Sequence, residues 1–125
     1  MISSILVVDD SKSSRKVNVA LIRELVGSEV TCLEATGGEH ALQILTSQHV
    51  DLVLLDLTMP GVSGFDVLAE MRRQNLNPRV IVVSADIQRL AKERVAALGA
   101  TGFIDKPIRM EPLRAMLSHL GVIHG

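Results

Sequence analysis

A chain of 125 residues is long enough for one domain with a substantial core, and 47% hydrophobic with 22% charged residues is typical of a globular protein rather than a disordered one. The formal net charge is -1 and the basic residues are scattered, which argues against direct binding of nucleic acid. The apolar runs are far shorter than the roughly 20 residues that cross a bilayer, and no signal peptide precedes them. We therefore expect a cytoplasmic domain that does not contact membranes.

Short apolar runs rich in Val, Ile and Leu alternate with longer amphipathic stretches along the chain. The runs are predicted as β-strands because they are short and rich in β-branched residues. Continuous apolar runs of this kind are typical of parallel strands that are buried on both faces. The five predicted strands are 5–8, 30–33, 52–55, 80–83 and 102–104.

The stretch after each run is predicted as a helix, since apolar residues recur there at intervals of three and four. In the first, Val17, Ala20, Leu21 and Leu25 form the expected apolar face, while charged residues such as Arg15 project elsewhere. The second predicted helix is marked by Ala41, Ile44 and Leu45, and the third by Val67, Leu68 and Met71. The fourth is marked by Leu90, Ala91, Val95 and Leu98, and Gly99 is predicted to end it. The fifth spans 111–120, with Pro112 in its first turn.

Five strand–helix units with short connections predict a single α/β domain over residues 1–125. Right-handed crossovers between parallel strands place helices on both faces, which gives a three-layer (βα)5 fold with a doubly wound, parallel, five-stranded sheet. In such folds ligands bind outside the carboxyl ends of the strands. The residues at those ends are therefore the first candidates for a functional site.

Charged and polar residues follow four of the five predicted strands. Asp9 and Asp10 follow the first, Asp56 the third, Ser84 the fourth and Lys106 comes shortly after the fifth. Three carboxylates close together repel one another, and a bound cation or a raised pKa relieves that repulsion. Hard oxygen ligands of this kind suit Mg²⁺. A magnesium site with a lysine counter-ion is the favoured interpretation.

A structural alternative is that these residues only cap helices, because Asp and Ser are preferred N-caps. For Asp10 or Ser11 alone that alternative stays open. Asp56 is followed by the turn 57–61 rather than by an immediate helix, and Lys106 is no cap at all. The complete set therefore favours function.

With these residues in order, the sequence resembles the receiver domains of bacterial response regulators over essentially its whole length. The resemblance implies the flavodoxin-like strand order 2-1-3-4-5 that the chemotaxis member of the family has. The matching segments are Val7-Val8-Asp9-Asp10, Leu54-Leu55-Asp56-Leu57-Thr58-Met59-Pro60-Gly61 with Gly64 following, Ser84-Ala85 and Lys106-Pro107.

The resemblance implies a phosphorylation switch of a two-component system rather than an enzyme with its own substrate. Asp56 would accept a phosphoryl group from a phosphohistidine on a sensor histidine kinase or phosphotransfer protein. Asp10 and Asp56 would bind Mg²⁺ directly, Asp9 mostly through water, and Thr58 through its backbone carbonyl. Lys106 would hold Asp56 and then a phosphoryl oxygen.

The resemblance also assigns the switch. The Ser84 hydroxyl would donate to the phosphoryl group and draw the following loop inward, which lets Phe103 on the fifth strand rotate from exposed to buried. A plain core role for Phe103 stays open. Thr58 and Asp86, two residues beyond Asp56 and Ser84, would tune the rate at which water removes the phosphoryl group.

An output protein or a fused output domain would then dock on the face formed by helix 4, strand 5 and helix 5. By position, this face includes Arg89, Phe103 and Arg114. Its partner is unknown from the sequence.

Three other functions share parts of this residue pattern. A phosphohydrolase of the haloacid dehalogenase type also uses Mg²⁺ and an aspartate nucleophile, but it needs a second Asp where Thr58 stands. A flavodoxin-like electron carrier needs a phosphate loop after the first strand and a Tyr or Trp, and the chain has neither. A receiver fold used only as an unphosphorylated binding module remains an alternative.

Overall fold

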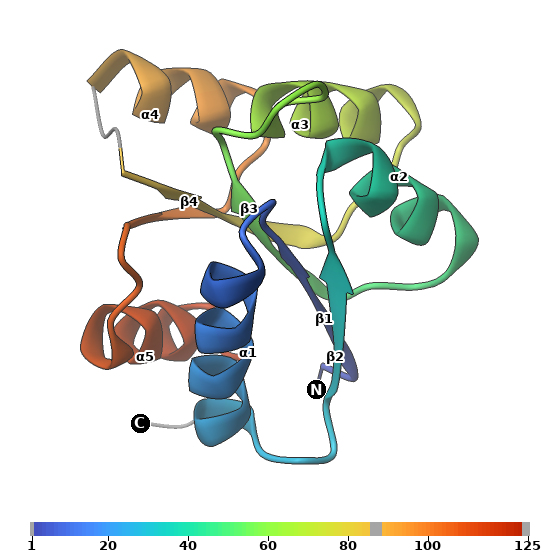
Figure 1. The fold of residues 1–125 in the computed structure, drawn as a ribbon. Helices are drawn as coiled ribbons and strands as arrows, with labels where there is room; N and C mark the ends of the chain where they lie inside the picture. Colours follow the sequence, from blue (N-terminus) through green and yellow to red (C-terminus); the bar gives the residue numbers. More distant parts are fainter. Residues whose placement is uncertain (1, 86–88, 124–125) are drawn as a thin grey trace.

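The computed structural model describes residues 2–85 and 89–123, with residues 89 and 90 described by their backbone alone. In this part of the chain, strands and helices alternate strictly (Figure 1). None of the helices described is long and apolar enough to span a bilayer. The elements are β1 (Ser4–Val8), α1 (Lys12–Val26), β2 (Thr31–Ala35), α2 (Gly38–Ser47), β3 (Leu52–Asp56), α3 (Gly64–Arg73), β4 (Arg79–Ser84), α4 (Arg89–Ala97), β5 (Gly102–Asp105) and α5 (Met110–His119).

The strands form a five-stranded sheet in which every neighbouring pair is parallel, in the order β2-β1-β3-β4-β5. The helices α2, α3 and α4 cover one face of the sheet and α1 and α5 cover the other, as Figure 1 shows. This arrangement confirms the predicted three-layer α/β fold and its strand order. Because all strands run in one direction, their carboxyl ends meet at a single edge.

Each face of the sheet has its own hydrophobic core, which explains the unbroken apolar runs. In β1, Leu6 and Val8 belong to the cluster under α2, α3 and α4, whereas Ile5 belongs to the cluster under α1 and α5. All five residues of β1 and of β3 are buried. Side chains alternate across a strand, so a strand that is covered on both faces needs apolar residues at successive positions.

The predicted apolar face of α1 was wrong in part. Val17 is 55% exposed and Ala20 is exposed as well, while the buried residues of the helix are Asn18 and Ile22. The packed face is centred on Ile22 and includes Leu21. A polar residue at position 18 interrupts the apolar pattern of this face, so the pattern favoured the neighbouring positions instead.

Strand ends also differ from the prediction. β2 spans Thr31–Ala35 instead of 30–33, because its parallel ladder with β1 continues until Ala35 pairs with Val8. β3 and β4 each continue to their polar last residues, Asp56 and Ser84, since both remain in register with neighbouring strands. Asp56 and Ser84 therefore lie on the sheet itself, whereas Asp9, Asp10 and Lys106 lie one or two residues beyond the ends of β1 and β5.

The helix ends follow local sequence signals. Ser11 is the N-cap of α1 and accepts a hydrogen bond from the Ser14 amide at 3.3 Å, which leaves Asp10 out of the capping role. Gly99, with a φ of 98°, follows the end of α4, as predicted for a helix stop. Pro112 lies in the first turn of α5, where no intrahelical amide bond is lost.

Candidate functional site

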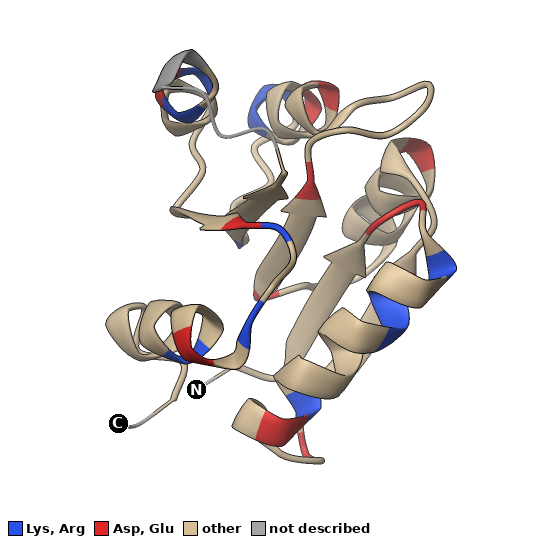
Figure 2. Cartoon of the chain, turned by 60° about the vertical axis from the view of Figure 1, so that its left-hand side comes forward, with Lys and Arg blue, Asp and Glu red and all other residues tan. Residues whose placement is uncertain are grey.

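The carboxyl edge of the sheet brings the predicted acidic residues together. One carboxylate oxygen each from Asp9, Asp10 and Asp56 lies within 4.8 Å of the others. The Lys106 ammonium lies 3.0 Å from Asp56 Oδ2 and 3.1 Å from Asp9 Oδ2. Figure 2 shows this arrangement as acidic segments at the ends of β1 and β3 that face a basic segment after β5. Residues nearly 100 positions apart in sequence thus share one site.

Asp9 is held from several directions at the end of β1. Its side chain is only 1% exposed, and Oδ1 accepts a hydrogen bond from the Ser11 amide at 2.9 Å. Its own amide donates to the Ala35 carbonyl at 3.2 Å, which extends the ladder between β1 and β2. Asp10, by contrast, is exposed. The pair therefore offers one fixed carboxylate and one that is open to solvent.

Asp56 is 4% exposed at the end of β3. Its Oδ1 accepts a hydrogen bond from the Thr58 amide at 3.2 Å, and its Oδ2 accepts one from Lys106. The backbone beside it packs against Gly64 at the start of α3. A Cβ there would lie 2.5 Å from the Asp56 carbonyl oxygen and 2.7 Å from Leu57 Cα. A glycine is required at position 64 because this approach leaves no room for a side chain.

Burial and the lysine act in opposite directions on the site's ionisation. Burial raises the pKa of Asp56, and the hydrogen bond and charge of Lys106 offset this only in part. Burial alone would lower the pKa of Lys106, but the hydrogen bonds and charges of Asp56 and Asp9 raise it above its ordinary value. Lys106 therefore stays protonated at neutral pH, while the ionised form of Asp56 is less favourable than that of an aspartate in water.

The donor set fits a hard divalent cation. Three carboxylates converge, and the completely buried Asp9 Oδ2 has the Lys106 ammonium at 3.1 Å as its one partner among the residues described. A carboxylate oxygen can take more than one partner, so this atom keeps capacity for a further one. Because oxygen-only sites with one or two direct carboxylates are typical of Mg²⁺, the residues agree with the predicted metal.

Ser84 lies beside this cluster at the end of β4 and is buried. Its carbonyl accepts a hydrogen bond from the Lys106 amide at 2.9 Å, so the backbone of β4 fixes the position of the lysine. The Lys106–Pro107 peptide bond that follows is cis. Ser84 and Lys106 are thereby brought together as the sequence predicted.

The remaining predicted residues are less directly placed at the site. Thr58 is exposed, and its amide donates a hydrogen bond to Asp56 Oδ1. Phe103 on β5 is half-buried against the core, and the Lys92 ammonium lies 5.6 Å from its ring centroid. Asp86 and the side chain of Arg89 lie outside the described residues. The metal and tuning roles of Thr58 and Asp86 stay predictions.

One functional candidate was missed from the sequence. Arg15 was expected to project away from the apolar face as a surface charge, yet its side chain is only 11% exposed. Its Nη1 donates to the Asp9 carbonyl at 2.9 Å. A basic residue in the first turns of a helix gives no sequence signal for such a contact, because the contact depends on how the helix is set against β1.

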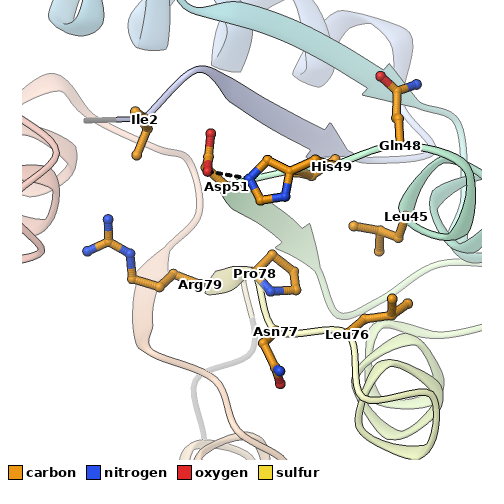
Figure 3. A pocket seen from close by; sticks show the side chains of 10 residues that line it. Ile2, Leu45, Gln48, His49, Asp51, Leu76, Asn77, Pro78 and Arg79 are labelled. Atoms are coloured by element: carbon orange, nitrogen blue, oxygen red, sulfur yellow. Dashed lines mark hydrogen bonds and ion pairs between the residues drawn. The ribbon is translucent and has the colours of Figure 1, made fainter.

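The opposite edge of the sheet contains a second group of polar residues. A cavity of about 480 Å³ lies there. Figure 3 shows His49, Asp51 and Arg79 among the side chains that line it. Asp51 Oδ2 accepts hydrogen bonds from the Ser3 and Ser4 amides at 2.7 and 3.0 Å. His49 Nε2 lies 2.7 Å from Asp51 Oδ1, and Arg79 donates to the Leu120 carbonyl. These contacts tie the amino terminus and the end of α5 to the sheet.

Fold and site together define a signalling receiver domain, and the sequence comparison agrees. Residues 5–118 match the family described as "Response regulator receiver domain", and the chain belongs to this family. Its members take part in two-component signalling in bacteria, where phosphorylation-dependent switching is their general function. This confirms the resemblance found in the sequence.

Individual relatives share the fold over nearly the whole chain. The transcriptional regulatory protein MalR of Bacillus subtilis is 32% identical over 115 residues, which cover 92% of this chain and 48% of MalR. The chemotaxis protein CheY4 of Vibrio cholerae aligns with a TM-score of 0.84 and 25% identity, covering 95% of this chain and 98% of that one. The response regulator TrrA of Thermotoga maritima, solved with Mg²⁺ and BeF, aligns with a TM-score of 0.80 and 28% identity over 95% and 99% of the two chains. This chain thus spans about half the length of MalR.

Proposed function

We propose that this chain is a phosphorylation-dependent switch whose phosphoacceptor is Asp56. The observation that supports the proposal most strongly is the buried Asp56 carboxylate, which is paired with Lys106 and lies within reach of Asp9 and Asp10. A purely structural aspartate gains nothing from two further carboxylates at its side, because they repel it. The arrangement is useful when a cation and an anionic phosphoryl group are both bound.

The proposed reaction is an in-line phosphoryl transfer. A carboxylate oxygen of Asp56 attacks phosphorus on a phosphohistidine, the O–P bond forms, and the P–N bond breaks with its electron pair returning to the imidazole. Such transfers depend on positioning and on charge neutralisation. Lys106 is already fixed beside Asp56 and remains protonated, so it can balance the negative charge of the incoming oxygens.

Mg²⁺ would be held by Asp10 and Asp56, by Asp9 mostly through water, and by the backbone carbonyl of Thr58. When bound, it supplies Lewis-acid stabilisation of the phosphoryl oxygens and offsets the repulsion among the carboxylates. The relative TrrA was solved with Mg²⁺ and BeF, which supports this assignment by analogy. The three carboxylates within 4.8 Å support it from this chain itself.

Ser84 and Phe103 are proposed to convert the new phosphoryl group into a change of shape. The Ser84 hydroxyl would donate to a phosphoryl oxygen, and the loop after β4 would move toward the site. Phe103, half-buried and beside Lys92, would then rotate further into the core. Thr58 and Asp86 would set how fast water ends the signal.

The output protein or output domain would dock on the face formed by α4, β5 and α5. A cavity of about 690 Å³ on this face is lined by residues of all three elements, among them Lys92, Phe103 and Met116. Arg89 and Arg114 belong to the same face by position. The donor would be a sensor histidine kinase or phosphotransfer protein in the cytoplasm, and the receiver of the signal would be an output protein or a fused output domain.

The test is incubation with Mg²⁺ and acetyl phosphate, followed by mass measurement of the intact protein. The wild-type chain is expected to gain a single phosphoryl group, and Asp56→Asn none. Asp51→Asn, which changes the aspartate at the other end of the same strand, is the control and is expected to gain it normally. A gain that survives in Asp56→Asn contradicts the assignment. A wild-type chain that never gains it would favour the unphosphorylated binding module.

A further inference from the structure

Arg15 connects the acidic loop, which is the segment of Asp9 and Asp10 after β1, to the edge strand β2. Its Nη1 donates to the Asp9 carbonyl at 2.9 Å, and its Nε donates to Glu34 Oε1 on β2 at 3.3 Å. The side chain is 11% exposed, whereas that of Glu34 is 47% exposed. A guanidinium has donors in a rigid planar fork, so two acceptors fix its orientation in a way that a lysine cannot reproduce.

The contact bears on Asp10 rather than on Asp9. Asp9 has its own amide, Oδ1 and Oδ2 engaged by Ala35, Ser11 and Lys106. Asp10 is exposed, and its side chain makes no hydrogen bond or ion pair with any residue in the described part of the chain. The orientation of the Asp10 side chain therefore depends on the backbone to which it is attached.

The Asp9 carbonyl and the Asp10 amide belong to one planar peptide group. A donor that holds the carbonyl oxygen therefore also fixes the plane from which the Asp10 Cα departs. Without that donor, the plane is restrained only by the contacts on either side, Asp9 with Ala35 and Ser11 with Asp9, so the Asp10 Cα is placed less precisely relative to Asp56.

We propose that Arg15 is a positioning residue that presents Asp10 to the cation, with Glu34 holding the guanidinium in place. The inference rests on the proposed Mg²⁺ site. Arg15 does not touch the metal or the phosphoryl group. It reduces the entropy that the acidic loop loses when the cation binds, which is the general effect of groups that orient metal ligands.

Electrostatics alone would give the opposite result. A positive charge beside three carboxylates opposes the binding of a second cation, so its removal would strengthen Mg²⁺ binding. A role confined to folding would give a third result, a lower melting temperature with unchanged Mg²⁺ affinity. The sign of the change in affinity thus distinguishes positioning from both alternatives.

The experiment is calorimetric titration of the full chain with MgCl2, with circular dichroism to check that each variant is folded. Arg15→Gln is expected to weaken Mg²⁺ binding about tenfold, in the range found for groups that orient metal ligands. Arg15→Lys is expected to recover only part of the affinity, and Glu34→Gln to lose less than Arg15→Gln. The matched control is Arg23→Gln, because Arg23 also lies on α1 and donates to a carbonyl, that of Val30 at 2.6 Å, but toward the other end of the helix.

Unchanged or tighter Mg²⁺ binding in folded Arg15→Gln overturns the inference, as does an equal loss in Arg23→Gln. If Arg15→Gln does not fold, unchanged affinity in both Arg15→Lys and Glu34→Gln overturns it as well. A wild-type chain that binds no Mg²⁺ removes the proposed metal site and the inference with it. Wild-type binding with no effect of Arg15 leaves the proposed function intact and rejects the inference alone.

Discussion

Strand β3 has an aspartate at each end, Asp51 directly before it and Asp56 as its last residue. Asp51 Oδ2 accepts hydrogen bonds from the Ser3 amide, the Ser3 hydroxyl and the Ser4 amide, and His49 pairs with the other oxygen. Asp56 is more deeply buried and has one amide donor and one lysine. The same side chain is therefore fully satisfied at one edge of the sheet and incompletely satisfied at the other.

The difference appears in the pKa values. At Asp51 the Ser3 amide, together with His49, the Ser4 amide and the Ser3 hydroxyl, outweighs burial and holds the pKa below its usual range. At Asp56 burial prevails over Lys106 and raises the pKa. Satisfied carboxylates stabilise folds, whereas a carboxylate that is costly to ionise is poised to react or to bind a cation. The amino edge thus anchors the chain, and the carboxyl edge is suited to chemistry.

The largest expected effect on this comparison is on metal binding. Asp10→Asn should weaken Mg²⁺ binding by at least about tenfold, because a charged ligand is lost and Mg²⁺ prefers carboxylates. Asp51→Asn lies at the other edge and should leave the affinity unchanged. Calorimetric titration measures both. Equal affinities in Asp10→Asn and the wild type would show that the acidic cluster is not the metal site.

Packing at the carboxyl edge should be the next most sensitive feature. Gly64→Ala is expected to lower the free energy of unfolding by about 1–3 kcal/mol, since the new Cβ meets backbone atoms of Asp56 and Leu57 that cannot move without shifting the strand end. Gly37→Ala is the control, because a Cβ there meets nothing within 4 Å. Urea denaturation measures both variants. A Gly64→Ala protein as stable as Gly37→Ala would contradict the close approach.

The smallest expected effect is at the amino edge and depends on pH. The folded-state pKa of Asp51 is depressed, so its contribution is fully present above the unfolded value of about 3.9 and is lost as the pH falls through the folded value. Asp51→Asn should lower the free energy of unfolding by about 1 kcal/mol at neutral pH, since charge-assisted hydrogen bonds in a partly exposed site are screened. Below about pH 4 the difference between variant and wild type should shrink. Chemical denaturation at several pH values measures it, and a difference that grows toward low pH would contradict the sign.

Much of the fold followed from the sequence because its strongest signals are local. The apolar runs had to be buried on both faces, and the polar residues after them had to share one edge. The face of α1 was mistaken where a single polar residue, Asn18, is buried against the expectation for its type. The end of β2 was mistaken because the register with β1, which no local pattern encodes, decides it.

The identities of the main site residues were also predictable from the sequence. Asp9, Asp10, Asp56, Ser84 and Lys106 were recognised from their places after strands and from the family resemblance. The contacts that hold these residues in place were not predicted. Gly64 was part of the matching segment, but its close approach to the end of β3 was not predicted, and Arg15 gave no signal at all. Both contacts depend on the angles at which helices meet the sheet, which are set by packing over many residues.

Asp56, and no other aspartate of this chain, is proposed to carry the phosphoryl group. Treatment of the phosphorylated protein with borohydride reduces an acyl phosphate to the alcohol and so marks the modified residue permanently. Tandem mass spectrometry of the peptides should then find homoserine at position 56, with aspartate retained at positions 9, 10, 51, 66, 86 and 105. Homoserine at any of those six positions, with an unmodified Asp56, would contradict the assignment.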